Sequence, residues 1–366
     1  MANESIQNVI SKFNYAGALT DIKDCNKGHI NGTYFVKCEE PNGKKHKYVL
    51  QSINTGIFKH PDQVMENIIH VTEHIKSKLI EEGKDPEQGT INIVYTKDGH
   101  YSYIDADKNY WRSYVFIEGD CYQSADSPEL LERVGKAFGH FQRQLADFDA
   151  SQLYETIPNF HNTVSRFADF ETAVREDKAG RASSICDEIR FILDRKSQCS
   201  FIVDGIADGR FPLRVTHNDT KLNNIMMDPV TGEGKCVIDL DTVMPGSVLA
   251  DFGDAIRFGA SSAAEDEKDL SKVFVRLEMF EGFTKGFIQG LESSLTKEEV
   301  LALPMGAYIL TLEQSMRFLG DYLNGDTYFR IHYPEHNLDR ARNQMKLVQD
   351  MEEKMNQMNA IVEKYL

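Results

Sequence analysis

The sequence lacks the cysteine patterns of metal centres and disulfide frameworks. Its 366 residues include six cysteines, and none forms a CxxC pair or stands at metal-ligand spacing from a histidine. They are Cys25, Cys38, Cys121, Cys186, Cys199 and Cys236. This scatter argues against zinc sites and disulfide-stapled small folds. It is typical of reduced proteins, so we expect a cytoplasmic location.

Long hydrophobic runs are also missing. No stretch approaches the roughly 18 consecutive apolar residues that suggest a membrane-spanning helix. Residues 1–14 contain no basic segment followed by an apolar one, which a secretory leader would need. We therefore expect neither secretion nor a membrane partner.

Positive charge is in short supply. The chain has 41 Lys and Arg against 57 Asp and Glu, a net charge of -16. This balance argues against a nucleic acid polymer as partner, and any phosphate-bearing ligand would need a metal or a few placed cations. Small-molecule ligands are expected instead. The sequence does not specify an oligomeric state.

What is present fits an ordinary folded protein of two lobes. Hydrophobic residues make up 41% and charged residues 27%, and no internal repeat or low-complexity tract interrupts the chain. A chain of 366 residues is longer than most single cores. A site between two lobes would suit this length.

The first part of the chain reads as short strands crossed by one helix. The strand candidates are Tyr34–Val36, Tyr48–Leu50, Ile91–Val94 and Tyr110–Ile117, with a turn at Pro41–Lys45 between the first two. Apolar residues at helical spacing predict a helix over Gln63–Ile80. We expect residues 1–118 to form a small antiparallel-sheet lobe that binds nucleotide.

The rest of the chain reads as mainly helical. Ser127 and Pro128 suit the start of a helix, and Gln344–Leu366 has the pattern of an amphipathic one. Two short apolar pieces, Ile225–Met227 and Cys236–Leu240, bracket a turn and predict a hairpin among the helices. The expected fold is α+β and bilobal, like a protein kinase, with residues 119–366 forming a catalytic and substrate-binding lobe.

The segment from His217 to Asn224 carries the strongest chemical signal. It has the H-x-D-x-x-x-x-N form of a kinase catalytic loop, and Asp239 follows after the predicted hairpin. Asp219 can orient and deprotonate a hydroxyl acceptor, while Asn224 and Asp239 can hold Mg²⁺ against a phosphate. His217 is expected to hydrogen-bond the loop backbone. ATP and Mg²⁺ are the expected cofactors. The alternative is an ordinary polar loop between two strands.

A second candidate for the metal site lies downstream. Asp251-Phe252-Gly253 spells the magnesium tripeptide of protein kinases. We assign the metal to Asp239 instead, because the hairpin delivers that residue next to Asn224. Asp251 and Asp254 are expected to cap a helix, order the catalytic loop or face the acceptor.

Upstream, a glycine-containing turn and the lobe junction are candidates for binding nucleotide. Close backbone approach to phosphates is possible where glycine precedes a strand. The candidate residues are Gly28, Asn31, Gly32, Thr33, Gln51, Phe116 and Glu118. Gln51 stands where a kinase would carry a phosphate-binding lysine. Either Gln51 binds a phosphate itself, or another cation supplies the charge.

These motifs resemble those of the aminoglycoside phosphotransferase and choline kinase superfamily. Within it, the chain is similar to the N-acetylhexosamine 1-kinases along nearly its whole length. The segments that carry this likeness are Gly28–Asn31, Leu213–Asn224, Ile238–Thr242, Met244–Ser247, Asp251–Asp254, Ile256–Ala260, Met316–Leu319 and Tyr333–Leu338. Those enzymes also have glutamine at the position of Gln51.

The resemblance implies an ATP-dependent kinase that phosphorylates the anomeric C1 hydroxyl of N-acetylglucosamine or N-acetylgalactosamine. It makes Asp219 the base and Asp239 a magnesium ligand. Candidates for reading the sugar are His29, Arg257, Arg317, Asp321, Tyr322 and Tyr328.

Two other functions remain open from the sequence. A kinase of choline, homoserine or an aminoglycoside would share the catalytic loop and differ in its acceptor pocket, which would need aromatic or carboxylate contacts to a cation. A nucleotide-binding pseudokinase is the second, and Gln51 is the feature that suggests it.

Overall fold

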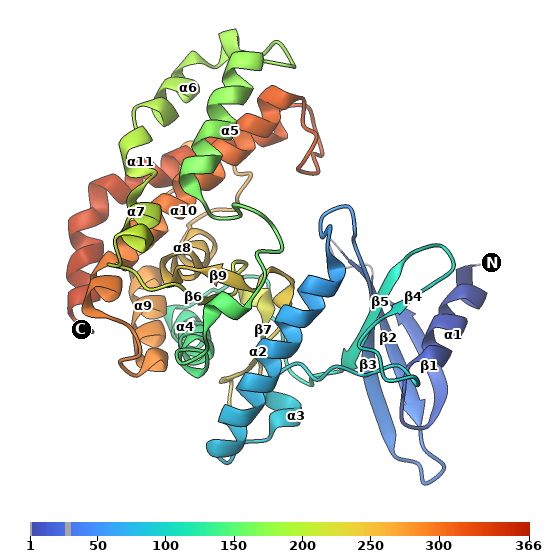
Figure 1. The fold of residues 1–366 in the computed structure, drawn as a ribbon. Coiled ribbons are helices and arrows are strands. Elements are labelled where there is room, and N and C mark those ends of the chain that lie inside the picture. Colours follow the sequence, from blue (N-terminus) through green and yellow to red (C-terminus); the bar gives the residue numbers. More distant parts are fainter. Residues whose placement is uncertain (1, 26–30) are drawn as a thin grey trace.

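The computed structural model describes residues 2–25 and 31–366. A strand-rich part and a larger helical part lie side by side, with helix α2 (Pro61–Glu81) between them (Figure 1). This is the mixed α+β, two-lobed, kinase-like fold that the sequence predicts. Within the described residues, no helix is both long and apolar enough to cross a bilayer.

A five-stranded antiparallel sheet forms the N-terminal part, in the order β1-β2-β3-β5-β4. Its strands are β1 (Ala18–Asp24), β2 (Gly32–Glu39), β3 (Lys45–Ile53), β4 (Tyr103–Ile104) and β5 (Tyr110–Val115). Side chains alternate between the two faces of each strand. One face carries Val36, Leu50 and Trp111, which pack with residues of helix α1 (Ala2–Lys12) in a small core. The other face is left to meet the helical part.

Helix α2 belongs to a different core. Val64, Ile68, Val71 and Ile75 recur at helical spacing and are all buried. They pack with the helices of the C-terminal part, not with the core under α1. Asn67 ties the same helix to the C-terminal part, since its Nδ2 donates to the carbonyl of Val243 at 3.0 Å. Helix α2 is thus fixed against the larger lobe.

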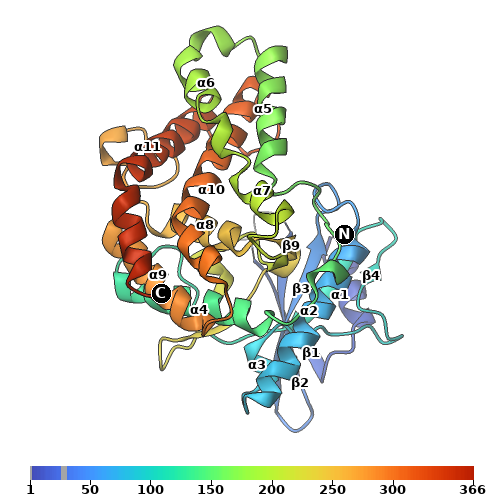
Figure 2. The same ribbon diagram turned by 60° about the vertical axis from the view of Figure 1, so that its left-hand side comes forward.

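The C-terminal part consists mainly of helices (Figure 2) and also contains two short antiparallel pairs of strands. Its helices are α4 (Pro128–Gln144), α5 (Thr163–Glu176), α6 (Cys186–Leu193), α7 (Phe201–Ala207), α8 (Val248–Gly259), α9 (Leu277–Leu291), α10 (Lys297–Asn324) and α11 (His336–Glu363), and a one-turn helix α3 (Pro86–Gly89) precedes them. The strand pairs are β6 (Arg214–Thr216) with β9 (Met244–Gly246), and β7 (Ile225–Met227) with β8 (Gly234–Val237).

Helices α4 and α9 approach each other closely because glycines line their contact. A Cβ on Gly286 would overlap the carbonyl oxygen of Glu132, and one on Gly139 would overlap that of Phe287. Residues four apart lie on the same face of a helix. The glycines of α9 at 282, 286 and 290 therefore form one stripe against α4, and no side chain there can be enlarged without separating the helices.

Most predicted elements are confirmed, and one is wrong. The hairpin of β2 and β3, helix α2, the start of α4 at Ser127 and Pro128, and the β7–β8 hairpin all form where expected. Ile91–Val94 is not a strand, because Ile93 makes only an isolated bridge to Tyr114. Helix α1 and strand β1 were not anticipated. Strand β1 is largely exposed, so its sequence lacks a clear alternating pattern.

Candidate active site

The catalytic loop is held in place by Asp251 of helix α8. Its Oδ2 accepts hydrogen bonds from the backbone N–H of His217 at 2.8 Å and from Gln142 Nε2 at 2.7 Å. Its Oδ1 accepts from the N–H of Asn218 at 2.7 Å. Asp251 is buried, and its carboxylate faces the loop backbone. Of the three roles offered by the sequence for this residue, the structure supports ordering the loop.

His217 links the loop to the segment that follows the hairpin. Its ring lies within 2.9 Å (Nε2) of the carbonyl of Ile238, and Nδ1 accepts from the N–H of Asp219 at 3.3 Å. These partners suit a neutral ring with its proton on Nε2. The side chain is fully buried among Phe138 and Phe141. His217 has the backbone-binding position expected of it.

Asp219 projects from this loop beside Asn224 and Lys221. Asn224 Nδ2 donates to the Asp219 carboxylate at 3.1 Å and to its carbonyl at 2.8 Å, so the amide oxygen of Asn224 is the atom left for a metal. Lys221 Nζ lies 2.5 Å from Asp219 Oδ1. Burial opposes the charge of Lys221, but Asp219 and Asp254 outweigh it and raise the pKa of the lysine. A carboxylate, an amide and a cation thus meet at one point.

Asp239 sits at the end of the hairpin in a left-handed backbone conformation (φ 60°). Asp239 is exposed at the surface, yet nearby protein partly removes water from its carboxylate. This desolvation, together with the negative charges of Asp241 and Asp219, raises the pKa of Asp239 to about 6. The structure gives this carboxylate no hydrogen bond or ion pair among the described residues. A carboxylate crowded by others is a position that a cation would stabilise.

These residues fit a magnesium site of the kind completed by a nucleotide. No three described His, Cys, Asp or Glu side chains converge on one point, so the protein alone does not enclose a metal. Mg²⁺ is commonly held by one or two carboxylates together with phosphate oxygens. Asp239 and Asn224 match that donor set. The N–H of Ile238 donates to the carbonyl of Asn224 at 2.9 Å, and this hydrogen bond keeps Asp239, the next residue, near Asn224.

On the sheet side of the site, Gln51 and Arg112 stand opposite each other on β3 and β5. Arg112 donates to Gln51 Oε1 through Nε at 3.0 Å and Nη2 at 2.7 Å. Its Nη1 lies 2.5 Å from Asp241 Oδ1. Gln51 Nε2 in turn donates to Thr33 Oγ1 at 3.2 Å, and Asn31 Nδ2 donates to Asp241 Oδ2 at 2.7 Å. The sheet is thereby joined to the segment Asp239–Asp241, which contains the proposed metal ligand and is called the metal segment below.

The remaining nucleotide candidates lie around the same edge of the sheet and at the lobe junction. Gly32 begins β2, whereas Gly28 and His29 lie outside the described residues. At the junction, the N–H of Phe116 donates to the carbonyl of Lys47, and the carbonyl of Glu118 accepts from Lys235 Nζ. Those two backbone groups already have protein partners, so adenine binding by this stretch stays a prediction.

On the other side of Asp219, charged side chains form a chain of contacts. Arg257 Nη2 donates to Asp254 at 2.9 Å, its Nη1 to Glu265 at 2.5 Å, and its guanidinium lies 3.8 Å from the Phe258 ring centroid. Although burial alone would raise it, Arg257 and Lys221 hold the pKa of Asp254 below its usual value. Arg257 is therefore linked to Lys221 through Asp254, and its role in binding a sugar stays a prediction.

The other sugar candidates cluster farther along helix α10. Arg317 and Tyr328 line a cavity of about 190 Å³, and the guanidinium of Arg317 lies 5.9 Å from the Tyr328 ring centroid. Asp321 lines it too, but its carboxylate accepts the N–H groups of Thr327, Tyr328 and Phe329, all at 2.9 Å. These hydrogen bonds hold residues 327–329 in place and need no ligand.

Tyr322 points elsewhere. Its side chain is buried, and the guanidinium of Arg181 lies 4.3 Å from its ring centroid. Neighbouring residues on a helix face different directions. Tyr322 and Asp321 thus both have structural partners, and their roles in sugar binding stay predictions.

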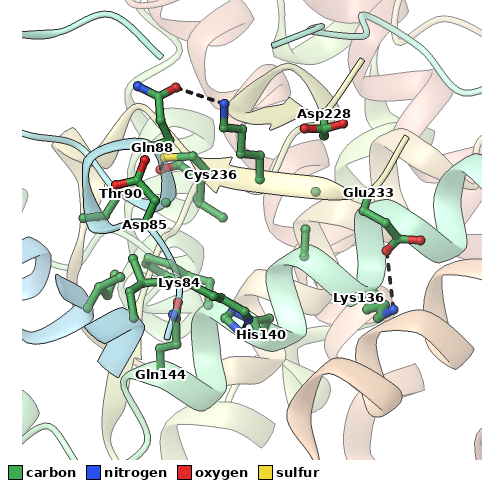
Figure 3. A pocket seen from close by; sticks show the side chains of 18 of the residues that line it. Lys84, Asp85, Gln88, Thr90, Lys136, His140, Gln144, Asp228, Glu233 and Cys236 are labelled. Carbon is green, nitrogen blue, oxygen red and sulfur yellow. Dashed lines mark hydrogen bonds and ion pairs between the residues drawn. The ribbon is translucent and has the colours of Figure 1, made fainter. Parts of the chain in front are cut away.

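A larger cavity, of about 460 Å³, lies apart from these residues (Figure 3). Lys136, His140 and Gln144 of helix α4 line one side, and Gln88 and Cys236 line another. The apolar part of its lining is formed by Ile75, Leu79, Ala137, Phe141 and Val237. None of the residues assigned above to base, metal, nucleotide or sugar lines this cavity.

Four residues of the site were given no role in the sequence analysis. Lys221 and Asp241 lie two residues after Asp219 and Asp239, so their spacing was the available signal. Arg112 could be found only from the pairing of β3 with β5. His161 lies within 3.3 Å (Nε2) of the carbonyl of Asn218 and 2.9 Å (Nδ1) of buried Glu313, and nothing in its local sequence marks it.

Solved structures of other proteins share this fold. Amicoumacin kinase, solved with AMP-PNP and Ca²⁺, superimposes with a TM-score of 0.60 at 13% identity, covering 97% of this chain and 94% of that one. Spectinomycin phosphotransferase with ADP gives 0.58 at 12% identity, covering 97% and 98%. Choline kinase from Cryptosporidium parvum Iowa II gives 0.56 at 14% identity, covering 94% and 92%. Identities this low show a shared fold.

The sequence itself supplies the family. The model of the phosphotransferase enzyme family, abbreviated APH, matches residues 21–274, which include the sheet, the catalytic loop, Asp239 and helix α8. This is more than half of the 366 residues. The chain therefore belongs to the APH phosphotransferase family, the small-molecule kinases of the aminoglycoside phosphotransferase and choline kinase superfamily.

Proposed function

We propose that this chain transfers the γ-phosphoryl group of ATP, with Mg²⁺, to the anomeric C1 hydroxyl of N-acetylglucosamine or N-acetylgalactosamine. The observation that carries the acceptor class is that the carboxylates around the base already have cation partners. Lys221 pairs with Asp219, and Arg257 pairs with Asp254 and Glu265. Choline or an aminoglycoside would need carboxylate or aromatic partners of its own, and these carboxylates could serve only by giving up the partners they have. A neutral sugar has no such need.

The sugar and its C1 position rest on the sequence resemblance to N-acetylhexosamine 1-kinases. The kinds of side chain near the base are compatible with it. Carboxylate, guanidinium and ammonium groups can donate to or accept from sugar hydroxyls and the acetamido oxygen. Arg257, Arg317 and Tyr328 stay our candidates for sugar contacts. The neighbouring structures add that nucleotides are bound on this fold, as AMP-PNP is in amicoumacin kinase.

The residues suggest a division of roles in the reaction. Asp219 would take the proton of the attacking hydroxyl, and Lys221 would offset charge on the transferring group. Asp239 and Asn224 would hold Mg²⁺, which neutralises phosphate charge when bound. Asp251 and His217 keep the loop in place through the contacts described above. Phosphoryl transfer depends mainly on such positioning and electrostatic stabilisation.

The test is a panel of acceptors assayed for ADP release with MgATP. We expect turnover with N-acetylglucosamine and N-acetylgalactosamine, and much less with glucose, because groups that read the acetamido moiety would be left unpaired. Phosphorus-coupled proton NMR should place the phosphate on C1. A 6-phosphate product, or activity only with choline, homoserine or aminoglycosides, would contradict the sugar assignment and leave the family intact. No acceptor-dependent ADP release would favour a pseudokinase.

A further inference from the structure

We propose that Arg112, held by Gln51, supplies the positive charge that offsets the triphosphate of the bound nucleotide, in place of a lysine on β3. The proposal rests on the nucleotide half of the proposed function. It concerns a residue that local sequence does not mark.

Gln51 is engaged by its neighbour and lacks any charge of its own. Its Oε1 accepts two hydrogen bonds from Arg112, at 3.0 and 2.7 Å, and its Nε2 donates to Thr33. An amide oxygen that accepts a two-pronged contact fixes the plane of a guanidinium. Gln51 therefore acts as the support that aims Arg112, and a lysine at this position would repel it.

The guanidinium is aimed at the metal segment. Arg112 Nη1 lies 2.5 Å from Asp241, two residues after Asp239, and both side chains of this pair are about 5% exposed or less. Charges interact more strongly where water is excluded. A cation at this place influences any phosphate that Asp239 helps to bind through a metal.

The other cation of the site is on the opposite side. Lys221 faces Asp219, the proposed base, and Asp254, so it can act on the phosphoryl group that moves to the acceptor. Lys47, on the same strand as Gln51, pairs with Glu118 at the lobe junction. Among the described cations, Arg112 is the one that joins the sheet to the metal segment. The net charge of -16 makes a local cation the more necessary for a triphosphate.

The experiment compares Arg112→Gln, the exchange variant Gln51→Lys/Arg112→Gln and the control Lys37→Gln. Lys37 is a half-exposed cation on β2 that pairs with Asp21, away from the site. We would measure MgADP affinity by calorimetry and the KM values for MgATP and sugar. Arg112→Gln should weaken MgADP binding and raise the KM for MgATP about tenfold or more, with the sugar KM within about twofold. Lys37→Gln should match the wild type.

The exchange variant separates charge from structure, because it moves the cation from β5 to β3, where we expect it to pair with Asp241. It should recover part of the lost MgADP affinity. Arg112→Gln could fail to fold because it leaves Asp241 buried and unpaired. In that event the exchange variant still tests the proposal. Wild-type MgADP affinity in folded Arg112→Gln, or an exchange variant that folds without binding MgADP, would overturn the proposal. MgADP binding needs no acceptor, so a wrong sugar assignment would not affect this result.

Discussion

Lys221 Nζ lies 2.5 Å from Oδ1 of Asp219, two residues earlier in the same loop. An ammonium beside the proposed base fixes the position of one carboxylate oxygen next to the place where an acceptor hydroxyl would bind. The remaining Oδ2 of Asp219 is hydrogen-bonded by Asn224. The carboxylate is thus oriented by its neighbours on both sides before any ligand arrives.

Asp219→Asn should fold and bind nucleotide almost normally while lowering kcat by about 10²-fold or more. The amide keeps the shape of the side chain and cannot take the proton. Turnover and MgADP affinity, measured on the same preparation, check this. Near wild-type turnover by a folded Asp219→Asn protein would remove Asp219 as the base.

Asp239→Ala and Asp251→Ala should fail in different ways. Asp239 makes no hydrogen bond within the described protein, so Asp239→Ala should lose only about 1 kcal/mol of stability, from its left-handed backbone, and should lose turnover at any practical Mg²⁺ concentration. Asp251 accepts three hydrogen bonds in a buried place, so Asp251→Ala should lower the free energy of unfolding by about 3 kcal/mol or more. Urea unfolding and Mg²⁺ titration of activity distinguish them. The reverse pattern would move the metal to Asp251.

His161 should make stability depend on pH. Burial opposes its charge, but Glu313 more than compensates and raises the pKa of His161 above its usual value. The ion pair therefore stabilises the protein fully below about pH 6.5 and loses this effect as pH rises through the folded pKa. The difference in unfolding free energy between wild type and His161→Gln should shrink from pH 6 to pH 9, as urea unfolding would show.

His140 provides the opposite control for this measurement. Burial lowers the pKa of His140, so its protonation is disfavoured in the folded protein. Wild type should gain stability relative to His140→Gln as pH rises toward neutral. Parallel slopes for the two variants would show that the His161–Glu313 pair does not act as described.

Gly286→Ala should destabilise the protein by about 3 kcal/mol, because the new methyl group would overlap the backbone of Glu132 across the α4–α9 contact. Gly320→Ala in helix α10 is a matched control, since a Cβ there would meet only Ala173 at 3.9 Å. That change should be neutral or stabilise by up to about 1 kcal/mol. Thermal and urea unfolding test both, and equal effects would contradict the close approach.

What could be predicted from the sequence was local. The loop from His217 to Asn224 and the hairpin leading to Asp239 depend on short-range spacing, and both lie where expected. Arg112 could not be placed, because its contact with Gln51 depends on the register of two strands 61 residues apart. Asp321 and Tyr322 show the converse. Each has the chemistry to bind a sugar, and each is held by protein groups that only the folded chain brings near.

The burial of helix α2 also sets what a movement between the sheet and the helical part would cost. Its apolar face lies in the C-terminal core, and exposing each of those side chains would cost about 1.5 to 3 kcal/mol. Any such movement would therefore leave α2 with the helical part. It would have to break the hydrogen bond from Tyr110 Oη to Asp62 Oδ1 (2.7 Å), which joins the sheet to α2. It would also have to break the contacts of Arg112 and Asn31 with Asp241, so that one carboxylate holds two groups of the sheet.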